Sequence, residues 1–266
     1  MLDQSSPLHH PSLQPEGKNA FAFKRLKRAL LNCELAPGEA ISEGDIADRF
    51  GLGRAAVRNA LARLEMEGFI SAIPRNGWQV APITGISIGD IIEARQLVEP
   101  QLATGLFSPE MLSSLRMISS QLSALAGRNE LEAIAASRAL DRSFLTLLAK
   151  KRGEIVLQWM DSALDHSARV LSYFEGSHPA YVASSRNALV DFLEIGDASS
   201  AQALLSQEVL QFREYVVGRM LRSSTFSSSV IEIASAGQPS TKSSTNTKDT
   251  QSLTASLIAE DKDIEQ

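Results

Sequence analysis

The sequence has one cysteine and no long apolar run. Cys33 is the only cysteine among 266 residues, which excludes an intramolecular disulfide. Its neighbours Leu30, Leu31 and Leu35 predict a buried apolar thiol rather than a nucleophile. No apolar stretch approaches the roughly 20 residues of a membrane-spanning helix, and the opening segment lacks the pattern of a signal peptide. We therefore expect a cytoplasmic protein without redox chemistry.

An excess of positive charge is also missing, because the net charge is −5. This charge argues against a protein that coats nucleic acid. Its distribution is uneven, since residues 18–83 contain ten Lys or Arg against seven Asp or Glu. A basic module on an acidic body is typical of a phosphate-binding head attached to a solvated domain.

Four segments of different composition follow one another. Residues 1–17 are rich in Pro, Ser, His and Gln and predict a disordered arm, whereas residues 223–266, dominated by Ser and Thr, predict a disordered tail. Between them, residues 18–83 combine helical spacing with one strand-like stretch. Residues 84–222 are helical throughout, because their apolar residues recur three and four apart. We expect two mainly α-helical domains.

Residues 18–83 predict three short helices and a hairpin. Ser42 is placed to cap the second helix, and Gly51 and Gly68 to end the second and third. Phe69–Ile73 and Trp78–Ala81 predict two strands around an Asn-Gly turn. Helix, helix, turn, helix and hairpin is the order of a winged helix-turn-helix. The expected apolar faces are Phe23, Leu26 and Leu30, then Ile46, Ala47 and Phe50, then Val57, Leu61 and Leu64.

The N-terminal end of the third helix carries the candidate DNA-binding residues. In a helix-turn-helix this end enters the major groove, where Arg pairs with guanine and Asn with adenine. Small residues let the backbone approach phosphates, and a hairpin tip can reach a minor groove. The competing interpretation is a solvated helix face and a plain surface turn. The candidates are Gly53, Arg54, Ala55, Arg58, Asn59, Arg75 and Gly77.

Most of residues 20–82 resemble the GntR family of bacterial regulators. The matching residues are Leu35-Ala-Pro-Gly38, Ser42-Glu43, Ile46-Ala47, Phe50-Gly51-Leu52-Gly53-Arg54, Val57-Arg58, Ala60-Leu61, Arg63-Leu64-Glu65, Glu67-Gly68-Phe69-Ile70, Pro74 and Gly77. The resemblance implies operator contacts by Arg54, Arg58 and the wing glycine, Gly77. The chain departs from the family at Gly53, where Ser or Thr is usual, and at Gly44, where several members have Arg. We expect an altered operator sequence and affinity.

The segment from Ile88 to Ala103 resembles the start of the FadR-like (FCD) ligand-binding domain, an antiparallel bundle of six or seven helices. Many relatives hold a divalent metal there with one Asp and three His, and the metal binds a carboxylate effector. Only the Asp is retained, as Asp141. The three His positions are occupied by Leu145, Arg186 and Glu208. Because a guanidinium cannot ligate a cation, we expect no bound metal and no cofactor.

The same substitution suggests a charged network in place of the ion, with Arg186 between Asp141 and Glu208. Such a network is either purely structural or leaves Arg186, with Arg95 nearby, able to hold an anionic effector. The resemblance therefore gives an effector pocket of Arg95, Asp141, Arg186 and Glu208. The two histidines of this domain, His166 and His178, are expected on a helix surface or in a loop rather than as ligands.

Three functions compete. The first is a homodimeric bacterial transcription regulator, most often a repressor in the resembled family, that binds a palindromic or near-palindromic operator under the control of a small anionic metabolite. The second is an enzyme using Asp141, Glu208 or His166, which no nucleophile motif, phosphate loop or complete metal set supports. The third is a constitutive DNA-binding dimer whose sensor domain has lost ligand binding. We expect the first.

Overall fold

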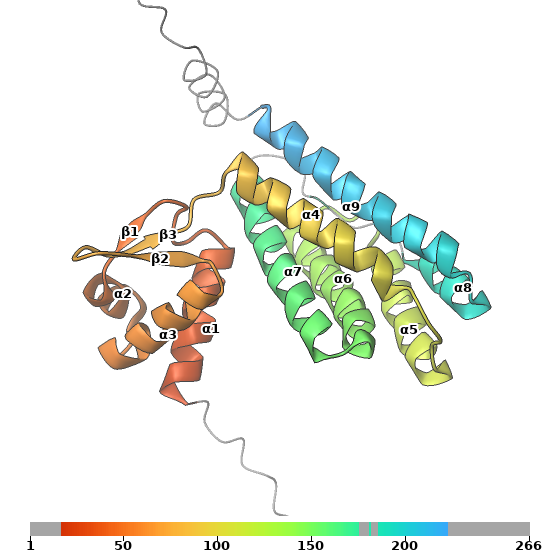
Figure 1. Ribbon diagram of the computed structural model, residues 1–266, viewed down its shortest axis with the longest axis horizontal. Helices are drawn as coiled ribbons and strands as arrows, with labels where there is room; N and C mark the ends of the chain where they lie inside the picture. Colours follow the sequence, from red (N-terminus) through yellow and green to blue (C-terminus); the bar gives the residue numbers. More distant parts are fainter. Residues whose placement is uncertain (1–16, 176–180, 182–185, 223–266) are drawn as a thin grey trace, which may run out of the picture. The chain divides into compact units, whose positions relative to one another are not determined.

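The computed structural model describes residues 17–175, 181 and 186–222 (Figure 1). The predicted arm, apart from Gly17, and the predicted tail, residues 223–266, lie outside the described residues. The first elements are α1 (Lys18–Leu31), β1 (Ala40–Ile41), α2 (Glu43–Phe50), α3 (Arg54–Met66), β2 (Ile70–Ile73) and β3 (Gly77–Val80). The helices that follow are α4 (Gly85–Leu102), α5 (Pro109–Leu125), α6 (Leu131–Arg152), α7 (Glu154–Phe174), α8 (Asn187–Ile195) and α9 (Ala198–Met220). The predicted fold class, a winged helix-turn-helix followed by a helical bundle, is confirmed.

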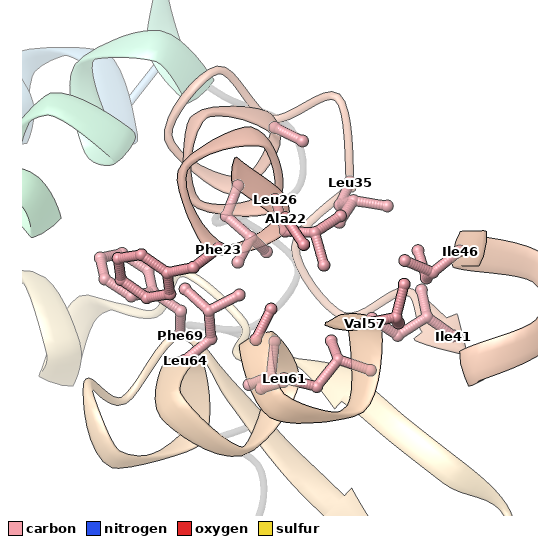
Figure 2. Close-up of a cluster of buried hydrophobic side chains, with 14 of the residues drawn as sticks. Ala22, Phe23, Leu26, Leu35, Ile41, Ile46, Val57, Leu61, Leu64 and Phe69 are labelled. Atoms are coloured by element: carbon pink, nitrogen blue, oxygen red, sulfur yellow. The ribbon is translucent and has the colours of Figure 1, made fainter. Parts of the chain in front are cut away.

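The core of the head forms where the predicted apolar faces meet (Figure 2). Leu26 of α1 and Leu61 and Leu64 of α3 have no exposed surface, and α1 packs against α3. Each fully buried leucine contributes about 1.5–3 kcal/mol relative to an exposed one. Cys33, expected to be buried, is half-buried, and burial raises the pKa of its thiol. Packing of α1 on α3 therefore fixes which face of α3 remains in solvent.

The predicted helix ends are confirmed. The Ser42 hydroxyl accepts a hydrogen bond from the backbone N–H of Asp45 at 3.1 Å, which caps α2. Gly51 ends α2 in the left-handed conformation, with φ of 63°. Gly68, with φ of 77°, follows the last residue of the α3 cap. Positive φ is the reason that glycine suits both ends.

The sheet contains one strand more than the sequence predicted and has a different turn. β1 pairs with β3, so the antiparallel order is β1-β3-β2. The hairpin is confirmed, but Ile73 pairs with Gly77, and the N–H of Asn76 donates to the Ile73 carbonyl at 3.0 Å. The turn is therefore centred on Pro74 and Arg75 rather than on an Asn-Gly pair. Arg75 has a φ of 65°.

The bundle is built on α4, which lies beside α9 and also packs on α7 (Figure 1). Its core contains the predicted apolar residues Phe144, Leu148, Leu189 and Leu193. Thr84 starts α4 with a reciprocal capping box to Ser87. Within the described ranges, none of the helices is both long and apolar enough to cross a bilayer.

Candidate nucleic-acid interface

The N-terminal end of α3 presents a polar face to solvent. Arg54, Arg58 and Asn59 are exposed, as is Ala55, whereas Val57 on the opposite face is fully buried. No side chain caps this end, because the N-cap is Gly53. The first backbone N–H groups of α3 are thus left without helical partners, and they add a partial positive charge beside the two arginines. This end of α3 can bind phosphate and present Arg and Asn to base edges.

Arg58 is held by a residue that the sequence analysis did not select. Its Nε donates to both carboxylate oxygens of Glu43 at 3.0 Å, and its Nη2 donates to Oε2 at 2.8 Å. The pair lowers the pKa of Glu43 and raises that of Arg58. Arg54, in contrast, is exposed and has no ion-pair partner within the described residues. Glu43 directly follows the Ser42 cap and begins α2. This position is the feature of the sequence that could have identified Glu43 as a site residue.

The wing carries Arg75 at its tip, where the side chain is exposed. Gly77 lies at the start of β3 with φ of 86°, and a Cβ at this position would lie 2.6 Å from the carbonyl oxygen of Ile41. The approach of β1 therefore gives Gly77 a structural role that is separate from the predicted DNA contact.

Three predicted effector residues form one buried ion cluster. Arg186 donates to Oδ1 of Asp141 through Nε at 2.8 Å and Nη2 at 2.6 Å, and it donates to Glu208 through Nη1. The cluster joins the start of α8 to α6 and α9. Arg95 pairs separately with Glu99 one turn along α4. The structure thus brings Asp141, Arg186 and Glu208 into contact, and it gives both arginines a carboxylate partner.

These four predicted residues line one cavity of about 360 Å³, together with Arg138 and Arg142. Arg138 pairs with Glu175, and Arg142 pairs with Asp161 and Asp165. Every arginine on this wall therefore already has an acidic partner.

The residues present do not fit the divalent metal of the resembled family. Leu145 offers no donor atom and has no exposed surface. The Arg186 guanidinium lies between the two carboxylates and would repel a cation. In the described ranges, no group of three His, Cys, Asp or Glu side chains is arranged to hold a metal.

Lys27 of α1 links the head to the bundle. Its Nζ lies 2.8 Å from Glu67 at the end of α3 and 2.5 Å from Asp165 of α7. Burial opposes the charge, but hydrogen bonds to Asp165 and Glu67 outweigh it and raise the pKa of Lys27. Asp165 also accepts from Arg142 at 2.6 Å. A continuous series of ion pairs therefore connects the cavity wall to the end of α3.

His166, expected on a helix surface or in a loop, lies on the surface of α7 that packs on the head. Its ring stacks on Phe69 with centroids 4.3 Å apart, and Nε2 lies 3.1 Å from the carbonyl oxygen of Glu67. Because a carbonyl only accepts, Nε2 carries the proton. Burial lowers the pKa of His166. His178 lies outside the described residues.

Comparison with known proteins connects this geometry to a family. Residues 18–80 match the model of the bacterial regulatory proteins of the gntR family. The chain is 30% identical over 193 residues to the HTH-type transcriptional regulator Rv0494 of Mycobacterium tuberculosis, covering 72% of this chain and 71% of that protein. It is 34% identical over 88 residues to the regulator YdhC of Bacillus subtilis, covering 33% of this chain but only 39% of that protein.

A solved structure has the same fold. The chain is similar to the Escherichia coli protein McbR/YncC, with a TM-score of 0.60 and 19% identity, over 76% of this chain and 98% of that one. At this identity the likeness concerns the fold alone.

Proposed function

The chain belongs to the GntR family of bacterial regulatory proteins and is a DNA-binding transcription regulator rather than an enzyme, and from this premise we propose that it is a metabolite-controlled repressor. In this proposal residues 18–83 bind a palindromic or near-palindromic operator in the cytoplasm. Residues 84–222 form a FadR-like, FCD-type domain that dimerises and senses the metabolite.

The exposed face at the start of α3 is the observation that carries the proposal. It places Arg54, Arg58 and Asn59 on the solvent side of a helix whose other side is fixed in the core. We assign Arg58 and Asn59 to base edges, Arg54 with Gly53 and Ala55 to phosphates and nearby bases, and Arg75 with Gly77 to the flanking groove. In a homodimer, two such heads would contact half-sites about one helical turn apart.

Arg58→Ala tests this assignment. An operator is first selected from random duplexes with the purified protein, and binding to it and to random DNA is then measured by fluorescence anisotropy. We expect the variant to lose about 1–3 kcal/mol of discrimination, because one bidentate base contact is removed. Arg63→Ala, an arginine near the other end of the same helix, is the control and should retain selectivity.

Undiminished preference of Arg58→Ala for the operator, with circular dichroism showing an intact fold, contradicts the role of α3 in base recognition. A reporter gene placed behind the operator then tests repression, since a repressor lowers its expression.

The Arg186 cluster is better explained as structural than as an anion grip. Each arginine around the cavity is already paired, so an entering carboxylate would compete with Asp141 or Glu208. Breaking such a buried pair is costly. The same observation supports a second candidate function, a constitutive DNA-binding dimer, which would bind its operator equally with and without any metabolite.

A further inference from the structure

We propose that a second cavity, formed where the head meets α4 and α7, binds a monocarboxylate with an apolar body, and that Arg169 holds the carboxylate group. The proposal extends the function proposed above by naming a ligand class and a site apart from the Arg186 cluster. Ligand binding itself does not require an operator.

Among the described residues, Arg169 is a buried cation without a counter-ion. Only 3% of its surface is exposed. Its Nη2 donates to the carbonyl oxygen of Ala81, but its buried Nε has no hydrogen-bond partner among the residues that the structure describes. No carboxylate lies within ion-pair distance of it in the described part of the chain, whereas the buried Arg95 and Arg186 both have one. Burial accordingly lowers the pKa of Arg169. An unpaired buried charge is unfavourable, and an anion would remove the penalty.

The cavity that Arg169 lines has the size and surface of a small-molecule site. Its volume is about 480 Å³, within the range of about 300–1,000 Å³ for ligand pockets. Apolar side chains dominate the wall and include Ile83, Ile91, Trp159 and Val170. Trp159 is 61% exposed, so this part of the wall is in contact with solvent. This wall suits a hydrocarbon or aromatic body, while Arg169 suits the acid group.

Other polar groups on the wall limit the ligand to a single negative charge. Asp90 of α4 is exposed and has no ion-pair partner within the described ranges, and its carboxylate would repel a second acid group. His166 adds no second positive charge near neutral pH, because burial lowers its pKa. A second acid group would therefore meet no further cation among the lining residues and would be repelled by Asp90.

An occupant of this cavity would touch both parts of the molecule. Gly68 follows α3 and Ala81 follows β3, and both line the cavity opposite α4 and α7. The ligand would thus contact the backbone next to the DNA-binding helix and next to the wing.

Isothermal titration calorimetry on the full chain without DNA tests the proposal. The probes are 3-phenylpropionate and octanoate, with 3-phenylpropionamide as the uncharged control and succinate as the dicarboxylate control. At least one monocarboxylate should bind ten times or more tightly than the amide, and succinate should bind more weakly than that acid. Arg169→Gln should lower the affinity at least tenfold, whereas the exposed Arg152→Gln should leave it unchanged.

Because Arg169 is buried, its substitution can also affect folding. A second variant therefore changes an exposed residue on the cavity wall. Ala94→Phe places a ring into the cavity from the surface of α4 and should abolish binding without lowering Tm. Equal binding of acid and amide, unchanged affinity in Ala94→Phe, or no binding of either acid at millimolar concentration overturns the proposal. A protein that binds the acid but not DNA would instead refute the proposed function alone.

Discussion

Glu43 controls what Arg58 is able to contact. Its carboxylate accepts three hydrogen bonds from the Arg58 guanidinium, and both side chains lie on the face that would meet DNA. The pair uses only two of the five guanidinium N–H groups, so both N–H groups of Nη1 and one of Nη2 remain for guanine while Glu43 stays bound. Alternatively, Glu43 moves with it and accepts a hydrogen bond from cytosine N4, the partner that carboxylates prefer in the major groove. The two possibilities predict opposite effects on DNA affinity when the negative charge of Glu43 is removed.

Glu43→Gln should raise the affinity for duplex DNA by about fivefold, because one negative charge near the phosphates is removed. Fluorescence anisotropy at two salt concentrations would measure this effect, which should shrink as salt rises. Asp48→Asn removes the same charge further along α2 and should have a smaller effect. A fall in affinity for the operator alone would mean that Glu43 itself recognises a base.

At the scale of elements, the wing depends on Gly77 for its geometry. The positive φ and the approach of the Ile41 carbonyl both exclude a side chain there. Glycine in this position thus has a structural explanation even in the absence of DNA.

Gly77→Ala should destabilise the protein by about 1–3 kcal/mol, the cost of a strained backbone, because β1 must also move away from β3. Urea unfolding of the full chain would measure the change. Gly44→Ala is the matched control, since a Cβ there meets nothing closer than the Ser42 hydroxyl at 3.8 Å. If both variants unfold alike, the close approach of β1 is not the cause.

The elements that the sequence predicted are those set by nearby residues. Ser42 and Asp45 cap a helix three residues apart, and Gly51 needs only its own φ, so the bounds of α2 could be found locally. β1 could not be found, because two residues show no periodicity and Ala40 pairs with the distant Gln79. The turn was misplaced because Gly77 pairs with Ile73 as the first residue of β3, which leaves Pro74 and Arg75 at the centre of the turn.

At the scale of the whole molecule, the head and bundle meet through charges and one stacked ring. Lys27, Glu67 and Asp165 come from three helices, and His166 lies beside them. No spacing in the sequence links these residues, so the sequence alone does not predict their contact. Asp141, Arg186 and Glu208 are also distant from one another in the chain. Their proximity was predicted only because they occupy the metal-ligand positions of the resembled family.

Acidification should weaken this junction through His166. Burial holds its pKa below the ordinary 6.5, so the unfolded chain takes up the proton first. The stabilisation is complete above about pH 6.5 and is lost as the pH falls through the lower, folded pKa. Lys27 and Arg169 oppose protonation, while Asp165 and the Glu67 carbonyl favour it.

Thermal unfolding between about pH 7.5 and 5 should therefore show a steeper loss of stability for the wild type than for His166→Gln. Carboxylates with lowered pKa, such as Glu34 and Asp197, titrate below this window in both proteins. Parallel curves for the two proteins would show that His166 does not titrate on unfolding.

The short strand β1 has a consequence for how DNA is chosen. Only Ser42 separates β1 from α2, and β1 pairs with β3. The strand therefore connects the wing to α2, which packs on α3. In the proposed complex with DNA, the wing and the start of α3 would then be held at one set separation, and the protein would not adjust to grooves of different width. The duplex has to deform instead, and base steps that bend easily will be preferred even where no side chain touches them.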